Sequence, residues 1–264
     1  MILRILFFLL LVGGGLWLPS VYKRTLHPFR VQKFQIDLPF HPEWESAVSL
    51  DEEVHALLQQ PFSYLAKGQQ SYVFLSSDQK YVLKLFRFNT CKIPIGQNLY
   101  TLYQKWKNPT ARKELPAQLK AEKTFASCKL ALSLVPELTG LVYIHLNPKE
   151  GLPTLCLKDR LGIPHRIDPA RYRFILQKKC DPFLKTLNAS KNPAKLAASF
   201  LQLLDRFEGL GLACYDPVMG RNFAFLDEQA IAIDIGNFFL NPEKAKESKD
   251  NFQKRFSACL EKIR

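Results

Sequence analysis

The chain has 264 residues, which is enough for one two-lobed domain with a sizeable buried core. Its content of 47% hydrophobic and 23% charged residues is that of an ordinary globular protein. Thirty-seven Lys and Arg against 24 Asp and Glu leave a formal charge of +13. This excess favours anionic partners, namely phospholipid surfaces, nucleotides, phosphorylated glycans or nucleic acid.

The cysteines and histidines do not form a recognisable metal or redox motif. The six cysteines include no Cys-x-x-Cys pair, and most lie among apolar residues, which is typical of buried free thiols. The five histidines are scattered without ligand spacing, so we expect no metal–histidine site.

The N-terminus carries a candidate membrane segment. Arg4 precedes an apolar run from Ile5 to Leu18, and counting residues 1–22 reaches the length of about 20 that a spanning helix needs. More positive charge follows the run than precedes it, so the domain is expected on the cytoplasmic side of a membrane, held by a single pass. The alternative is a signal peptide, cleaved during export of the protein.

Residues 23–50 are expected to be an irregular linker, because prolines interrupt them. A helix is predicted at 51–59, where acidic residues occupy the first turn. Strands are predicted at 62–66, 71–76 and 80–87, with a hairpin turn at 76–79.

The middle of the chain is predicted to be a long helix at about 110–134, ended by Pro136. Residues 137–147 can either prolong this helix or form a strand. Alternation in 152–158 and 171–177 predicts a β-hairpin joined through Leu161-Gly162-Ile163.

The last third is predicted to be mostly helical, at about 182–189 and 193–208 and in a charged helix that runs to the C-terminus. Two short strands are expected at 222–226 and 229–233. The order of elements, strand-rich first and helix-rich second, indicates an α+β fold.

The first candidate functional segment is Leu65-Ala66-Lys67-Gly68-Gln69-Gln70-Ser71-Tyr72-Val73. Small residues at Ala66, Gly68 and Ser71 let a hairpin backbone lie close to phosphates, where its N–H groups bind them. An ordinary β-turn explains the same segment better when it is taken alone.

The second candidate is Lys84 in the apolar sequence Tyr81-Val82-Leu83-Lys84-Leu85-Phe86. A lysine among apolar strand neighbours needs an anionic partner if it faces inward. The long helix offers Glu122, which follows the stripe through Leu119 and Ala126; Glu114 and Glu137 are the competing partners.

The most informative segment spans 209–239. It contains Asp216 in a loop, then Arg221-Asn222, two short strands and Asp234-Ile235-Gly236. This order, together with the glycine-containing segment and Lys84, resembles the protein-kinase-like superfamily over residues 62–240.

The resemblance implies a two-lobed fold, with an antiparallel sheet in the N-lobe at about 51–177 and a reduced helical C-lobe at about 178–264. It implies ATP and Mg²⁺ as cofactors. Ala66, Gly68, Ser71 and Val73 would then lie over the nucleotide, Lys84 and Glu122 would form the phosphate-binding pair, and Gln177 and Lys178 would lie in the hinge that binds adenine.

In the same resemblance, Asp216 is the catalytic base, and Asn222 and Asp234 are the magnesium ligands. Arg221 neutralises charge on the transferring group.

The chain departs from the family pattern in three places. Cys214-Tyr215 replaces the usual His-Arg before the catalytic Asp, and Asn222 lies one residue further from Asp216 than in most members. The segment after Gly236 contains no Ala-Pro-Glu motif and is too short for the helical platform that docks peptide substrates. The chain therefore resembles compact relatives that phosphorylate small molecules, sugars or lipopolysaccharide cores.

Two functions of different classes follow from these motifs. One is a membrane-anchored, ATP- and Mg²⁺-dependent phosphotransferase that acts on the hydroxyl of a small molecule, lipid or glycan. The other is an inactive kinase-like module that binds nucleotide or serves as a scaffold at an anionic membrane surface. Nucleic acid binding is not favoured, because the basic residues are dispersed and do not interleave with aromatic residues.

Overall fold

The computed structural model describes Phe29, Phe34, Leu38 and residues 40–45, 51–68, 70–87, 117–214 and 218–261. The predicted membrane segment 1–22 and most of the predicted linker 23–50 lie outside the described residues. Among the helices that are described, none has the length and apolar character needed to span a bilayer.

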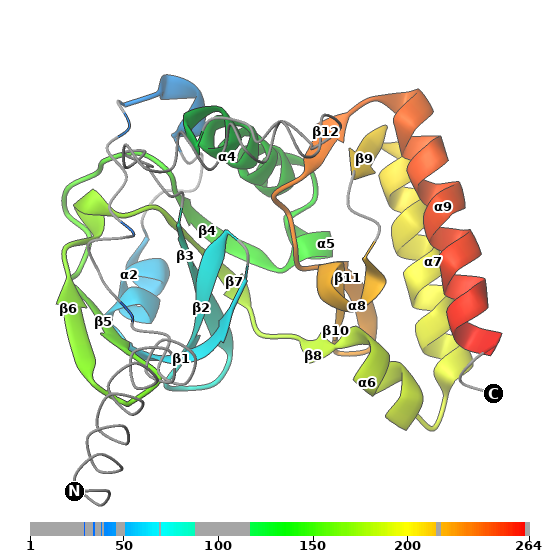
Figure 1. The fold of residues 1–264 in the computed structure, drawn as a ribbon, viewed down its shortest axis with the longest axis horizontal. Helices are drawn as coiled ribbons and strands as arrows, with labels where there is room; N and C mark the ends of the chain where they lie inside the picture. The colour runs from blue at the N-terminus through cyan, green and yellow to red at the C-terminus, as the bar shows by residue number, and fades with distance from the viewer. Residues whose placement is uncertain are drawn as a thin grey trace, which may run out of the picture.

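A seven-stranded sheet forms the first part of the fold, at the left of Figure 1. Its strands are β1 (Pro61–Lys67), β2 (Ser71–Ser76), β3 (Tyr81–Phe86), β4 (Leu141–His145), β5 (Leu155–Lys158), β6 (Pro164–Ile167) and β7 (Phe174–Lys178). They lie in the order β4-β7-β3-β2-β1-β5-β6. The prediction of an antiparallel sheet was wrong at one position, because β1 and β5 pair in parallel.

The predicted hairpin between 152–158 and 171–177 was also wrong. β5 pairs across the turn at 161–163 with β6, so that Leu155 lies opposite Ile167, whereas β7 lies between β3 and β4. The three strands predicted at 62–66, 71–76 and 80–87 are confirmed as β1 to β3. The ambiguous stretch 137–147 contains both a short helix and a strand.

Helices are α2 (Glu52–Gln59), α4 (Ala117–Leu134), α5 (Pro136–Thr139), α6 (Phe183–Ala189), α7 (Pro193–Gly209), α8 (Met219–Asn222) and α9 (Pro242–Glu261). The short strands β8 (Asp181–Pro182), β10 (Phe223–Leu226) and β11 (Gln229–Ala232) form one sheet, and β9 (Leu212–Cys214) pairs with β12 (Phe238–Leu240). The predicted helices 51–59, 182–189 and 193–208 are confirmed.

The two faces of the seven-stranded sheet enter different hydrophobic cores. On β3, Leu83 and Leu85 belong to a core shared with α2, whereas Phe86 belongs to a core shared with α4 and the C-terminal helices. Because side chains alternate along a strand, Lys84 lies on the same face as Phe86. This places Lys84 between the sheet and the second part of the fold.

The second core is centred on α7, whose apolar stripe was predicted from its 3.6-residue period. The stripe is fully buried, and its members are Leu196, Phe200, Leu203, Leu204 and Phe207. Phe200 contacts the rings of Phe183, Phe223 and Phe256 at centroid distances of 4.8–5.0 Å. Helices α7 and α9 run side by side at the right of Figure 1.

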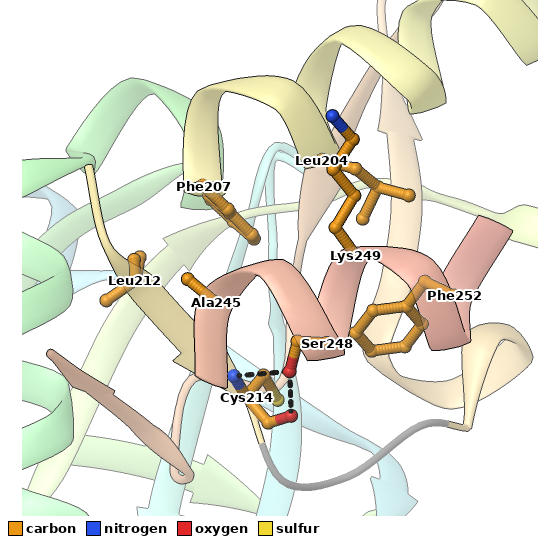
Figure 2. Close-up of a pocket in the computed structure, with 8 residues that line it drawn as sticks. All are labelled: Leu204, Phe207, Leu212, Cys214, Ala245, Ser248, Lys249 and Phe252. Carbon is orange, nitrogen blue, oxygen red and sulfur yellow. Dashed lines mark hydrogen bonds between the residues drawn. The ribbon is translucent and has the colours of Figure 1, made fainter. Parts of the chain in front are cut away.

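A small cavity of about 10 Å³ lies between α7, α9 and β9, as Figure 2 shows. Its lining is mostly apolar, and its volume corresponds to about one water molecule. Beside it, Ser248 Oγ donates a hydrogen bond to the Cys214 carbonyl at 2.8 Å, and Lys249 Nζ binds the carboxylates of Asp205 at 2.8 Å and Glu208 at 2.6 Å. The lysine ion pairs join α9 to α7 and the serine bond joins α9 to β9, and we assign the cavity no function.

Candidate active site

The site begins with one row of residues across four neighbouring strands. Ala66 on β1 lies opposite Val73 on β2, Val73 lies opposite Lys84 on β3, and Lys84 lies opposite Ile175 on β7. Residues directly opposite one another in a sheet point to the same face. Ala66 and Val73 from the first candidate segment and Lys84 from the second therefore share one surface, which faces α4 and the C-terminal part.

Lys84 joins this surface to the Asp234 segment. Its Nζ donates a hydrogen bond to the backbone carbonyl of Ile233 at 2.5 Å. Burial lowers the pKa of Lys84, and the negative charge of Asp234 opposes part of that effect. The ammonium of Lys84 and the carboxylate of Asp234 thus interact electrostatically, whereas the resemblance implied Glu122 as the partner of Lys84.

Asn222 and Asp234 are held together by the backbone. The carbonyl of Asn222 accepts hydrogen bonds from the N–H of Ile233 at 2.7 Å and of Asp234 at 3.3 Å. Asn222 is buried at the end of α8, whereas Asp234 is exposed. The two predicted magnesium ligands are therefore neighbours across the β10–β11 hairpin.

Of the two predicted catalytic residues of this segment, Arg221 is described by the structure and Asp216 is not. Arg221 is exposed on α8, next to the buried Asn222. Asp216, the predicted catalytic base, lies outside the described residues. Both roles remain predictions.

Helix α4 contributes hydroxyl and thiol groups to the site. Ser127 Oγ donates to the carbonyl of Ile235 and accepts from the N–H of Phe238 at 2.6 Å, so it bridges both sides of Gly236. Cys128 lies near Lys84 and Asp234, and burial, followed by the charge of Asp234, raises the pKa of its thiol to about 12. The Cys128 thiol is therefore neutral at physiological pH.

The predicted glutamate partner of Lys84 is not found where the sequence placed it. Thr124, Ser127 and Cys128 face the site, and with 3.6 residues per turn Glu122 points to the opposite side of α4. The stripe used to select Glu122 is exposed at Leu119, which is 41% accessible.

Of the two competing glutamates, Glu137 is engaged elsewhere, and the role of Glu114 stays a prediction. Glu137 lies 3.9 Å from Arg206 in an ion pair, and Glu114 lies outside the described residues. Within the described part of the chain, the charged group acting on Lys84 from the second half of the fold is Asp234.

The turn between β1 and β2 reaches the Asp234 segment. Gly68 N–H donates to the Ser71 carbonyl at 2.8 Å, which closes the turn. Gln70 Oε1 accepts a hydrogen bond from Thr124 Oγ1 at 3.0 Å. A Cβ placed on Gly236 would lie 3.5 Å from Thr124 Cγ2 and 3.8 Å from Gln70 Oε1, so the turn, α4 and the Asp-x-Gly sequence meet at one point.

The predicted hinge at Gln177 and Lys178 does not offer the hydrogen-bond donors that adenine binding was expected to use. The N–H of Lys178 donates to Gly140 at 2.7 Å and that of Lys179 to Lys80 at 2.8 Å. Gln177 Nε2 donates to the carbonyl of Thr139 at 2.6 Å. These groups are used within the protein, so adenine would have to bind other backbone atoms after β7.

Beyond those residues, the chain passes close to Lys84 at Cys180. Burial raises the pKa of the Cys180 thiol to about 11, and the charge of Lys84 acts against this shift. Cys180 is therefore close enough to Lys84 for the two groups to interact electrostatically.

The donor set at Asn222 and Asp234 fits a magnesium ion. An amide oxygen and a carboxylate are the hard oxygen ligands that Mg²⁺ prefers, and the ion usually takes its other ligands from phosphates and water. Within the described ranges, no cluster of three or more His, Cys, Asp or Glu side chains offers an alternative metal site.

Sequence reasoning missed four residues that connect the site: Gln70, Thr124, Ser127 and Cys128. For the three residues on α4, the sequence signal is the small polar side chains at Thr124, Ser127 and Cys128, which recur at helical spacing.

Comparison with solved structures finds the bifunctional kinase-methyltransferase WbdD. Its medium-resolution structure is 15% identical, with a TM-score of 0.36 over 66% of this chain and 31% of that chain. The 2.2 Å structure is 15% identical, with a TM-score of 0.39 over 68% of this chain and 33% of that chain. The co-crystal structure with the kinase inhibitor LY294002 is 14% identical, with a TM-score of 0.32 over 67% of this chain and 33% of that chain.

The chain thus spans about a third of the length of the WbdD structures that it matches. No protein-family model and no curated protein matches it. With TM-scores this low, an activity for this chain has to be argued from its own contacts.

Proposed function

We propose that the chain is a kinase-like phosphotransferase that uses ATP and Mg²⁺ to phosphorylate a hydroxyl group of a small molecule, lipid or glycan. The observation that carries the proposal is the hydrogen bond from Lys84 to Ile233, the residue before Asp234. This contact joins a strand lysine to a candidate metal ligand across the space between the sheet and the helices.

Phosphoryl transfer requires positioning and charge neutralisation more than covalent chemistry by the protein. In the proposed complex, Lys84 binds phosphate oxygens, and Asn222 and Asp234 hold the magnesium ion, which neutralises charge on the phosphates. Ala66 and Val73 lie against the nucleotide from the sheet. The turn at Gly68 and Ser71 covers the phosphates and is tied down through Gln70.

The acceptor hydroxyl attacks the terminal phosphorus, and the bond from that phosphorus to the leaving ADP oxygen breaks. Asp216 takes the proton of the hydroxyl, and Arg221, on the exposed side of α8, neutralises charge on the transferring group. The acceptor is proposed to lie at a membrane, where residues 1–22 hold the domain on the cytoplasmic side.

The site is tested by thermal melting of the full chain in detergent with ATP plus Mg²⁺, ATP plus EDTA, or neither. We expect ATP plus Mg²⁺ to raise the melting temperature and EDTA to remove most of the shift, because ligand binding to the native state stabilises it. Asp234→Asn should lose the shift. Asp227→Asn is the matched control, because Asp227 is an exposed turn residue between β10 and β11.

A shift that persists in Asp234→Asn, or an equal loss in both variants, would overturn the proposed site. One observation favours a second candidate, the inactive nucleotide-binding module: α4 presents the neutral Cys128 thiol towards Lys84 where a kinase is expected to present a carboxylate. ATP stabilisation without Mg²⁺-dependent phosphate release or transfer would select this alternative.

A further inference from the structure

The turn between β5 and β6 exposes two large apolar side chains. Leu161 is 57% accessible and Ile163 is 50% accessible. Lys158, Arg160 and Arg166 surround them and are exposed as well. Exposed apolar residues within a basic ring are typical of surfaces that bind an anionic lipid bilayer.

The turn holds these side chains in a fixed orientation. Asp159 Oδ1 accepts hydrogen bonds from the N–H of Leu161 at 2.9 Å and of Ile163 at 3.0 Å. Gly162 adopts a φ of +80°, which favours glycine. The other carboxylate oxygen of Asp159 binds His165 Nε2 at 3.0 Å, so the one acidic group of the turn is engaged within it.

Phe29 connects this turn to the end of the predicted linker. Its ring lies 5.1 Å from that of His165 and 5.9 Å from that of Tyr72. Only residues 23–28 separate Phe29 from the predicted membrane segment, and such a stretch spans about 25 Å at most. The turn therefore lies close to the point where residues 1–22 would leave the bilayer.

Two further cations lie on the other side of Phe29. Lys67 Nζ is 5.5 Å and Arg87 Cζ is 5.7 Å from the centre of the Tyr72 ring. No acidic partner of either cation is found in the described ranges of the chain. Burial, followed by the charge of Arg87, lowers the pKa of Lys67. This surface is therefore strongly positive.

We infer that the β5–β6 turn and its basic surroundings are a second membrane contact, which docks the domain on an anionic phospholipid surface. Leu161 and Ile163 enter the interfacial region, and Lys158, Arg160, Arg166, Lys67 and Arg87 bind phosphate headgroups. The inference rests on the proposed tethering by residues 1–22 and does not depend on phosphoryl transfer. Docking would fix which way the nucleotide site faces relative to the bilayer.

The test is hydrogen–deuterium exchange of the full chain in nanodiscs of neutral phosphatidylcholine and in nanodiscs that also contain phosphatidylglycerol. We expect exchange in residues 159–166 to slow by about tenfold in the anionic nanodiscs. The β2–β3 turn at 76–79 should not change. The Leu161→Ser/Ile163→Ser double variant should lose the slowing, and raised salt should weaken it.

The matched control is Leu184→Ser/Leu240→Ser, which changes two apolar residues of comparable exposure in the C-terminal part. It should behave as the original chain does. Equal exchange in both lipids would overturn the inference, and so would slowing that depends on protein concentration in detergent, which would indicate a second copy instead. ATP-dependent melting of the same sample reports separately on the nucleotide site.

Discussion

Lys84 donates a hydrogen bond to the carbonyl of Ile233, a residue 149 positions later in the sequence. The acceptor is the residue immediately before Asp234, so the lysine on β3 and the Asp-x-Gly sequence are held at a fixed separation. A phosphate group that binds at this point would meet the cation of Lys84 beside the carboxylate of Asp234.

The first prediction concerns the pH dependence of nucleotide binding. Burial lowers the pKa of Lys84 below its ordinary value of 10.5, and a bound phosphate should raise it again. ATP affinity should therefore fall as the pH rises towards 10.5, beginning earlier than for an exposed lysine. Isothermal titration in buffers of different ionisation enthalpy should show proton uptake on binding.

In Lys84→Arg, the arginine keeps its charge to much higher pH than the lysine does. Any ATP affinity that this variant retains should therefore not fall as the pH rises towards 10.5. Lys80→Arg, in the exposed β2–β3 turn, is the control and should match the original chain. The unfolded chain binds a proton at Lys84 more strongly than the native chain does. The contribution of Lys84 to the free energy of unfolding should hence rise as the pH approaches 10.5. A pH profile identical in all three proteins would contradict the assignment.

The second prediction concerns Ser127, which bonds the backbone on both sides of Gly236. Ser127→Ala leaves a buried carbonyl and a buried N–H without their partner, at a cost of about 1–3 kcal/mol in the free energy of unfolding. It should also reduce ATP–Mg²⁺ stabilisation, because Asp234 is adjacent. Urea unfolding and thermal melting measure the two effects.

Ser133→Ala, an exposed substitution on the same helix, should change unfolding by less than about 0.5 kcal/mol. If the two alanine variants behaved alike, the bridging role of Ser127 would be refuted.

The third prediction concerns acid stability. His145 is buried, with its Nε2 bonded to the carbonyl of Pro169 at 3.0 Å. Burial, followed by the charge of Arg173, lowers the pKa of His145 from 6.5 to about 4. The unfolded chain therefore binds more protons between these values, and the free energy of unfolding should fall by about 3 kcal/mol as the pH drops through this range.

Urea unfolding of the original chain and of His145→Gln, each at pH 6.5 and pH 4, measures this contribution. The variant should lose less stability on acidification than the original chain. His55→Gln, on the surface helix α2, should retain the full acid sensitivity; an unchanged pH dependence in His145→Gln would be inconsistent with a neutral buried imidazole.

The fourth prediction concerns the core of the C-terminal part. Phe200→Ala removes a ring that contacts three other buried rings, and should lower the free energy of unfolding by about 3–5 kcal/mol. Leu201→Ala, at the next position and 37% accessible, should cost less than about 1 kcal/mol. Similar losses in the two variants, measured by urea unfolding, would show that the stripe does not form the core.

Local sequence patterns predicted the elements that are determined by residues close together in the chain. The stripe of α7 follows from its period, and the turns at 76–79 and 227–228 follow from their polar residues. The sequence analysis paired β5 with the wrong strand, because the alternation of residues in 171–177 indicates a strand but does not indicate which strand lies beside it. The strand that actually pairs with β5 across the turn, β6, has only four residues, starts with Pro164 and exposes Arg166.

The choice of Glu122 failed for a related reason. Hydropathy selects the apolar stripe of a helix as its buried side, but the buried side of α4 combines apolar residues such as Phe125 with Thr124 and Ser127. Their partners are backbone atoms and an amide more than 50 positions away, which a local pattern cannot indicate. The ordered set of motifs assigned Lys84 and Asp234 to one nucleotide site, but it gave Glu122, and not the Asp234 segment, as the partner of Lys84.

The pairing of β9 with β12 bears on how this chain can diverge. Leu212 lies opposite Leu240, and Cys214 lies opposite Phe238. The two ends of segment 215–237 are therefore held side by side by this strand pair. This segment carries Asn222, the β10–β11 hairpin and Asp234, so one two-stranded pair fixes both ends of the part of the chain that holds the candidate site. Substitutions within the segment leave that attachment to the surrounding scaffold in place.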